Sequence, residues 1–319
     1  YESEHATEFR VSPDGEYLAF AERFKVYVTP LVESGKAINI GPKDSKFPIE
    51  QLSVRAGESI SWSADSSKLY WTLGPELYHA SLNGVFAINS KSDADFKVKN
   101  GENIGFSKKV NEPKGMIALT GGKIITMNGD KVIENGVIIT DGKHIKAVGS
   151  ASEINIPKDA EVIDVTGKTI MPGIVDAHAH GSQGSNEIIP QQNWKNFAGL
   201  ALGVTTIHDP SNDTTEIFTA SEMQKAGMIV GPRIFSTGTI LYGANMPGYT
   251  SHIDSLEDAK FHLERLKKVG AFSVKSYNQP RREQRQQVVE AGRELEMMVV
   301  PEGGSLLQHN LSMVVDGHT

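Results

Sequence analysis

The chain has 319 residues, 39% of them hydrophobic, with a formal net charge of −7 and no cysteine. The length allows two or three domains with buried cores, and the acidic balance argues against nucleic acid as a partner. The lack of cysteine excludes disulfides, thiolate zinc sites and cysteine nucleophiles, and no run approaches the roughly 18 apolar residues that a membrane span needs.

Residues 1–112 have an all-β pattern, in which short alternating runs are separated by turn residues. Two stretches, Phe9 to Leu31 and Ile60 to Leu82, share a frame with a Ser-x-Asp turn followed by two short strands. Their spacing of about 50 residues is typical of β-propeller blades. The frame resembles the WD40-like repeats of TolB-like propellers. Two blades cannot close a ring, so we interpret the region as a partial propeller; a small independent β-sandwich is the alternative.

Residues 113–170 change to β-branched strands separated by glycine-containing turns. This pattern is typical of β-hairpins. The turn pairs are Gly121-Gly122, Asn128-Gly129, Asn135-Gly136 and Asp141-Gly142. With its exit, DVTGKTIMPG, the segment resembles the small β-sandwich that precedes the barrel in metal-dependent amidohydrolases. In that family strands from the C-terminus complete the sandwich, and this sequence contains none, so we expect a partial sandwich.

The stretch MPGIVDAHAH, from Met171 to His180, predicts a buried strand with Asp176, His178 and His180 on one face. Two neutral imidazoles so close are suited to a divalent metal. A bare HxH is also compatible with two histidines that merely share a core strand, but the preceding Pro-Gly turn and Asp176 favour the metal site. The decamer resembles the first barrel strand of the amidohydrolase superfamily. The resemblance implies a (β/α)8 barrel in which both histidines bind metal.

After His180, strands and helices alternate through residues 181–319. The predicted helices are 192–202, 215–226, 256–269, 281–295 and 306–315, and the predicted strands after the first are 203–210, 232–238, 271–277 and 297–304. Strand followed by helix five times predicts parallel strands with right-handed crossovers. We therefore expect residues 171–319 to form strands 1 to 5 of a (β/α)8 TIM-type barrel. The expected fold class is multidomain β plus α/β.

Catalytic groups in such barrels lie at the carboxyl ends of the strands. The fourth predicted strand carries Lys275, which would be costly to bury as an isolated cation. The resemblance implies that Lys275 is carbamylated and bridges two metals; a plain salt-bridged lysine is the alternative. Tyr277 shares its face, and its phenol could polarise a substrate carbonyl or simply pack at the strand end.

The fifth predicted strand departs from the family, because VVPEGG places Glu302 where a metal-binding histidine is usual. A carboxylate can bind zinc, so Glu302 is a candidate ligand, and it could even bridge the metals in place of Lys275. An ordinary acid at a helix N-terminus is the alternative. The sixth-strand histidine and eighth-strand aspartate of the family would fall after Thr319, and we interpret His318 as part of a loop.

The remaining polar residues receive less weight. His208 and Asp209 close the second strand, and Tyr242 and His252 lie in a predicted loop after the third strand, where substrate contacts often occur. Five histidines without a partner pattern are interpreted as structural or solvated: His5, His79, His144, His262 and His309.

These observations predict a metal-dependent amidohydrolase that cleaves amide or related carbon–nitrogen bonds with a metal-activated hydroxide. The expected cofactor is one or two divalent ions, zinc above all, and the expected substrate is a small molecule or a peptide-like or cyclic amide. The alternative is a non-catalytic, propeller-based binding protein with a degenerate barrel. We expect no membrane span, and either a homo-oligomer or a complementing chain.

The first residue, Tyr1, is not a methionine, so we expect a processed product or an excised fragment. The general base of the family is missing from the sequence, and an incomplete barrel has unpaired edges, so we expect little activity from this chain alone. Propellers of this type suggest a periplasmic or secreted protein.

Overall fold

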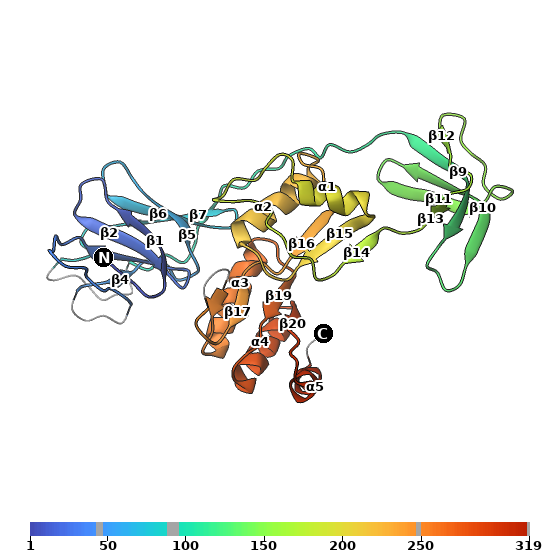
Figure 1. Ribbon diagram of the computed structural model, residues 1–319. Helices are drawn as coiled ribbons and strands as arrows, with labels where there is room; N and C mark the ends of the chain where they lie inside the picture. The colour runs from blue at the N-terminus through green and yellow to red at the C-terminus, as the bar shows by residue number, and fades with distance from the viewer. Residues whose placement is uncertain (43–46, 88–95, 247–249, 318–319) are drawn as a thin grey trace. The chain divides into compact units, whose positions relative to one another are not determined.

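A computed structural model describes residues 1–42, 47–87, 96–246 and 250–317 (Figure 1). His318 therefore lies outside the described residues. The chain divides into two compact units, which we describe separately. The first unit contains Tyr1–Ser107, Asp209–Phe218 and Ser236–Thr319, and the second contains Lys108–His208 and Thr219–Phe235.

The N-terminal part of the first unit consists of two four-stranded antiparallel sheets, each with its strands in chain order. The first contains β1 (Ala6–Val11), β2 (Tyr17–Glu22), β3 (Lys25–Pro30) and β4 (Glu50–Gln51), and the second contains β5 (Glu58–Trp62), β6 (Lys68–Leu73), β7 (Glu76–Ser81) and β8 (Glu102–Asn103). The shared sequence frame therefore folds into the same arrangement twice. Both sheets contribute to one core that includes Val28, Leu69 and Trp71.

The two Ser-x-Asp turns are built alike. The Ser12 hydroxyl donates to Asp14 at 2.6 Å, and the Ser63 hydroxyl donates to Asp65 at 2.6 Å. Each carboxylate also accepts the backbone N–H two residues later, as an Asx turn requires. The hydrogen bond from Ser63 lowers the pKa of Asp65 to about 2. The turns thus explain why the same short motif starts each hairpin.

The second unit begins with a five-stranded sheet. Its order is β11-β10-β9-β12, and β13 also pairs with β9. The strands are β9 (Met116–Ile125), β10 (Val132–Asp141), β11 (His144–Ser150), β12 (Glu161–Asp164) and β13 (Thr169–Ile170). β9, β10 and β11 form antiparallel hairpins, whereas β12 and β13 run parallel to β9. Two of the four predicted glycine turns connect these strands: Asn128-Gly129 lies between β9 and β10, and Asp141-Gly142 joins β10 to β11. The other two predicted turns are wrong, because Gly121-Gly122 lies inside β9 and Asn135-Gly136 inside β10.

A three-stranded sheet follows, in the order β14-β15-β16. The elements are β14 (Ile174–Asp176), α1 (Trp194–Ala201), β15 (Val204–Asp209), α2 (Thr214–Lys225) and β16 (Arg233–Ser236). β14 runs parallel to β15. The prediction of a buried strand through His180 was wrong: β14 ends at Asp176, and Ile174 and Val175 are 50% and 61% exposed. The Asp176 carboxylate accepts the N–H of His178 at 3.1 Å, which turns the chain instead of extending it.

The C-terminal part of the first unit is a parallel sheet in the order β18-β17-β19-β20. Its elements are β17 (Ile240–Tyr242), β18 (Thr250–His252), α3 (Leu256–Lys268), β19 (Ser273–Ser276), α4 (Arg282–Glu294), β20 (Met298–Pro301) and α5 (Leu307–Asp316). The loop expected around Tyr242 and His252 is therefore wrong, because both residues end short strands. Val274 of β19 packs in one core with Leu263 of α3 and Val288 of α4. The helices thus cover one face of the sheet.

No helix among the described residues is both long and apolar enough to cross a membrane.

Candidate functional site

The carboxyl edge of the β18-β17-β19-β20 sheet carries a row of polar and aromatic side chains. Tyr242 is in register with His252, and Leu241 is in register with Ser276, so Tyr277 follows beside Tyr242. The backbone N–H of Glu302 donates to Ser276 O at 3.0 Å, which places Glu302 next along the edge. Carboxyl ends of parallel strands are where enzymes of this architecture place their chemistry.

Lys275 lies on the face of the sheet that the helices do not cover. Successive residues of a strand point to opposite faces, and Val274 packs against the helices, so Lys275 points away from them. Lys275 is nevertheless only 1% exposed. Its ammonium forms an ion pair with the carboxylate of Glu302, whose side chain is 28% exposed. A buried cation needs such a counterion, so the structure brings these two predicted residues together as a pair.

Tyr277 and Tyr242 meet at the same edge. Their ring centroids are 5.2 Å apart and the ring planes are at 89°, an edge-to-face contact. Both side chains are half-buried. Tyr277 follows Lys275 by two residues in the sequence, and its phenol ring contacts the ring of Tyr242.

The two predicted metal-binding histidines belong to the second unit. The rings of His178 and His180 are 4.9 Å apart, at an interplanar angle of 67°. Both residues are exposed, and the N–H of Ala179 between them donates to His208 O at 3.1 Å. Two imidazoles at this separation can provide two adjacent ligands to one divalent ion, so their donor chemistry fits a zinc-like metal.

The structure does not assemble a complete metal shell. Across the described ranges 1–42, 47–87, 96–246 and 250–317, no group of three or more histidine, aspartate or glutamate side chains is arranged to hold a metal ion. Lys275, Tyr277 and Glu302 form one group in the first unit, and His178 and His180 form another in the second. The carboxylate of Glu302 in the first group and the imidazoles of the second group are ligand types that a divalent metal accepts.

Other polar residues have local structural roles. Asp209 is 1% exposed; its carboxylate accepts Ser211 N–H at 2.9 Å and Asn212 Nδ2 at 2.7 Å, which shapes the turn before α2. His262 is 2% exposed, and its Nε2 lies 3.1 Å from His252 O. Burial lowers the pKa of His262 well below its ordinary value, so its ring is neutral. His262 is therefore structural, which is one of the two alternatives, structural or solvated, that the sequence left open.

Two buried glutamines near the carboxyl edge were not among the residues predicted from the sequence. Gln279 is 5% exposed and Gln284 is fully buried. Both side chains bind backbone groups at the end of β17. No periodicity marks these residues, because a glutamine after a strand or early in a helix looks like an ordinary surface residue.

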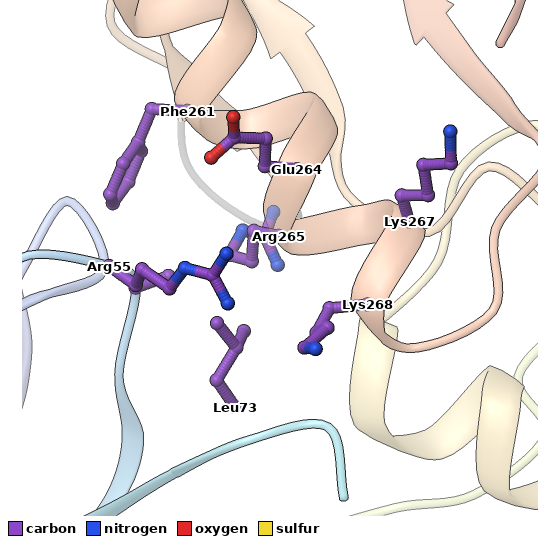
Figure 2. Close-up of a pocket in the computed structure, with 8 residues that line it drawn as sticks. Arg55, Leu73, Phe261, Glu264, Arg265, Lys267 and Lys268 are labelled. Carbon is purple, nitrogen blue, oxygen red and sulfur yellow. The ribbon is translucent and has the colours of Figure 1, made fainter. Parts of the chain in front are cut away.

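A cavity of about 210 Å³ lies in the first unit, between the N-terminal sheets and α3 (Figure 2). Four cations line it, and each already has a partner. Arg265 pairs with Glu58 at 3.3 Å, Lys268 pairs with Glu76 at 2.6 Å, Arg55 lies 3.8 Å from Glu76, and Lys267 donates to Leu295 O at 2.7 Å. Lys267 and Lys268 end α3, which leads into the amino end of β19. The cavity is therefore a packing contact at the opposite end of the sheet from Lys275 and Glu302.

No family model matches the chain. Imidazolonepropionase of Bacillus cereus (strain G9842) is 31% identical over 153 residues, which are 47% of this chain and 28% of that protein. Enamidase of Eubacterium barkeri is 35% identical over 91 residues, which are 27% of this chain and 22% of that protein.

Solved structures of hydrolases share the fold. A putative prolidase from Bifidobacterium longum aligns with a TM-score of 0.54 and 23% identity over 64% of this chain and 53% of that one. A Xaa-Pro dipeptidase aligns with a TM-score of 0.53 and 18% identity over 64% of this chain and 60% of that one. The chain thus spans only part of the length of each of these relatives. The chain is thus similar in sequence to parts of imidazolonepropionase and enamidase, and about two thirds of it share the fold of these hydrolase structures.

Proposed function

We propose that this chain is part of a metal-dependent hydrolase that cleaves amide or related carbon–nitrogen bonds, with peptide-like or cyclic amides as its substrates. The observation that carries the proposal is the buried Lys275 paired with Glu302 at the carboxyl edge of a parallel sheet, beside Tyr277. A charged pair on the face that the helices leave uncovered adds little stability, because desolvation of the two charges offsets their attraction. A catalytic role therefore explains better than a structural role why this pair lies at the carboxyl edge of the sheet.

The proposed ligands of one or two divalent ions are His178 and His180 in the second unit, and Glu302 and Lys275 in the first unit. Neutral imidazoles and carboxylates are the usual oxygen and nitrogen ligands of zinc. When bound, a divalent metal lowers the pKa of water and polarises a carbonyl.

Tyr277 would act directly on the substrate. Its phenol is half-buried at the strand end and can donate a hydrogen bond to the oxygen of the scissile carbonyl. Lys275 would serve in its carbamylated form, in which an anion replaces the ammonium. Glu302 would then be both the resting counterion of Lys275 and a metal ligand.

The test combines metal content with turnover. The variant with His178→Ala and His180→Ala should lose bound zinc and the hydrolysis of a panel of amides, because both proposed imidazole ligands are removed. His144→Ala is the matched control, since His144 is an exposed histidine on β11 of the same unit. Unchanged zinc stoichiometry in the double variant would refute the assignment.

The replacement of the usual histidine by Glu302 favours a second candidate, a non-catalytic binding protein with a degenerate barrel. The same assay distinguishes the two. A protein that holds zinc but hydrolyses no amide of the panel would support the binding protein.

We propose the same domain organisation as the sequence suggested: TolB-like propeller blades in residues 1–112, a small β-sandwich in 113–170 and barrel strands in 171–319. The twofold repeat of a four-stranded antiparallel sheet supports the blades. We also propose a periplasmic or secreted location, and low activity of this chain unless another chain complements the barrel.

A further inference from the structure

A single buried carboxamide holds the backbone on both sides of Tyr242. Gln279 Oε1 accepts the N–H of Gly243 at 2.9 Å, and Gln279 Nε2 donates to Leu241 O at 2.8 Å. Gln279 is 5% exposed, so both polar atoms are removed from water and satisfied by this backbone. The Gln279 carboxamide thus makes the two hydrogen bonds that a neighbouring strand would make to residues 241–243.

A second glutamine holds the next peptide. The Nε2 of Gln284 donates to Gly243 O at 3.2 Å and to Ile253 O at 3.3 Å. A Cβ at residue 243 would lie 2.0 Å from Gln284 Nε2, so only glycine allows this approach. Two buried amides and a required glycine thus fix the end of a strand that is only three residues long.

The residue held in this way is not a core residue. Tyr242 is half-buried, and its partner in the edge-to-face contact, Tyr277, is half-buried too. Among the described residues, neither phenol hydroxyl has a hydrogen-bond partner. Leu241, one residue earlier, packs in the core with the helices, so Tyr242 points to the face where Lys275 lies. The fixed backbone therefore presents an aromatic ring toward the proposed site.

We infer that Tyr242 and Tyr277 form an aromatic corner that binds a planar ring attached directly to the scissile amide, and that Gln279 is the positioning residue for Tyr242. This inference rests on the proposed hydrolase function, whose substrate class it narrows. Two rings at 89° offer a flat substrate one π face to stack on and one ring edge to contact. Saturated and acyclic amides lack the flat surface that such a corner binds.

The experiment compares two substrates on the zinc-loaded full chain, supplemented with any complementing chain that activity requires. Benzamide carries a planar ring and cyclohexanecarboxamide has a saturated ring of similar size. In Tyr242→Leu we expect kcat/KM for benzamide to fall roughly three- to tenfold through KM, with cyclohexanecarboxamide unchanged. Tyr242→Phe should keep the preference, because the ring remains.

Gln279→Leu tests the positioning role. It removes both hydrogen bonds at similar volume, so it should reduce the preference for benzamide as Tyr242→Leu does, whereas Gln279→Glu keeps the acceptor and should restore part of it. Tyr70→Leu, on β6 of the same unit, is the control and should change neither substrate. If Tyr242 or Gln279 had only a structural role, its substitution would lower kcat/KM equally for the two substrates. That result would overturn the inference.

Benzoate binding, measured by calorimetric titration, separates this inference from the proposed function. If no amide is hydrolysed but benzoate binds the parent protein and binds Tyr242→Leu roughly three- to tenfold more weakly, the aromatic corner stands and the hydrolase proposal fails. If benzoate binds both proteins equally, or does not bind the parent, the aromatic corner is refuted whatever the turnover.

Discussion

Glu302→Gln should destabilise the first unit more than the loss of Lys275 does. Lys275 is 1% exposed, and its only charged partner among the described residues is Glu302, whose side chain is 28% exposed. Breaking a buried ion pair typically costs roughly 3–5 kcal/mol, because a buried charge is left without a partner. A glutamine oxygen still accepts one hydrogen bond and the site is partly open to water, so we expect about 2–3 kcal/mol.

Substitution of Lys275 instead leaves Glu302 without its charged partner. In Lys275→Met the remaining charge belongs to Glu302, which water can reach, and methionine fills most of the lysine volume. We therefore expect a loss of only about 1 kcal/mol. The double variant should lose about 2 kcal/mol, less than the sum of the two single losses, because no buried charge is left.

The assay is urea unfolding of the metal-free chain, with the midpoint and slope measured for each variant. Glu294→Gln is the control, since Glu294 pairs with Lys260 at the surface and its loss should leave the unfolding midpoint almost unchanged. Equal and additive losses for Glu302→Gln and Lys275→Met would refute the reasoning, because they would show that the ammonium of Lys275 does not depend on Glu302.

Three further predictions concern the metal, the carbamate and pH. The variant with His178→Ala and His180→Ala should retain no zinc after dialysis, whereas His144→Ala should match the parent; equal zinc in all three proteins would contradict the histidine site. Reconstitution with zinc and bicarbonate should add the mass of one carbon dioxide to the intact parent protein under native conditions but not to Lys275→Met, and an unmodified native mass in a fully active protein would rule out the carbamate. Hydrogen bonds from Arg282 and then Arg285 hold the pKa of Asp316 below its usual range. The stabilisation that Asp316 gives α5 is thus present above the unfolded pKa of about 4 and is lost as pH falls toward the folded pKa. The stability difference between the parent and Asp316→Asn should be constant above about pH 5 and shrink in acid; a difference that does not change down to pH 3 would contradict this sign.

The helices and strands after His180 were predictable because their apolar residues follow the helical and strand periods closely. Helix α3 begins at Leu256 and α4 ends at Glu294, within one residue of the predicted bounds. The hairpins of residues 113–170 followed from turn chemistry at sites such as Asp141-Gly142. Both signals are local in sequence, so a single chain is enough to detect them.

The errors arose where one side chain altered the backbone. A period-two pattern predicted a strand through His180, but the Asp176 carboxylate binds the N–H of His178 and ends the strand. The residues around Tyr242 looked like a loop, because glycine and proline follow it. Gln279, far along the chain, supplies the hydrogen bonds that keep this segment extended. Such long-range pairing of a side chain with the backbone leaves no periodic trace.

The pairing of Lys275 with Glu302 offers a reason why Glu302 stands where a metal-binding histidine is usual. The sequence presents Glu302 as the loss of a neutral ligand, whereas the structure makes it the counterion of a buried lysine. Conversion of Lys275 to a carbamate would place two anions side by side in a poorly solvated position, where their repulsion is much stronger than in water. A divalent cation held by these residues would reduce that repulsion. Metal loading and carbamylation should therefore favour each other, because a coupling free energy between two binding events acts equally in both directions.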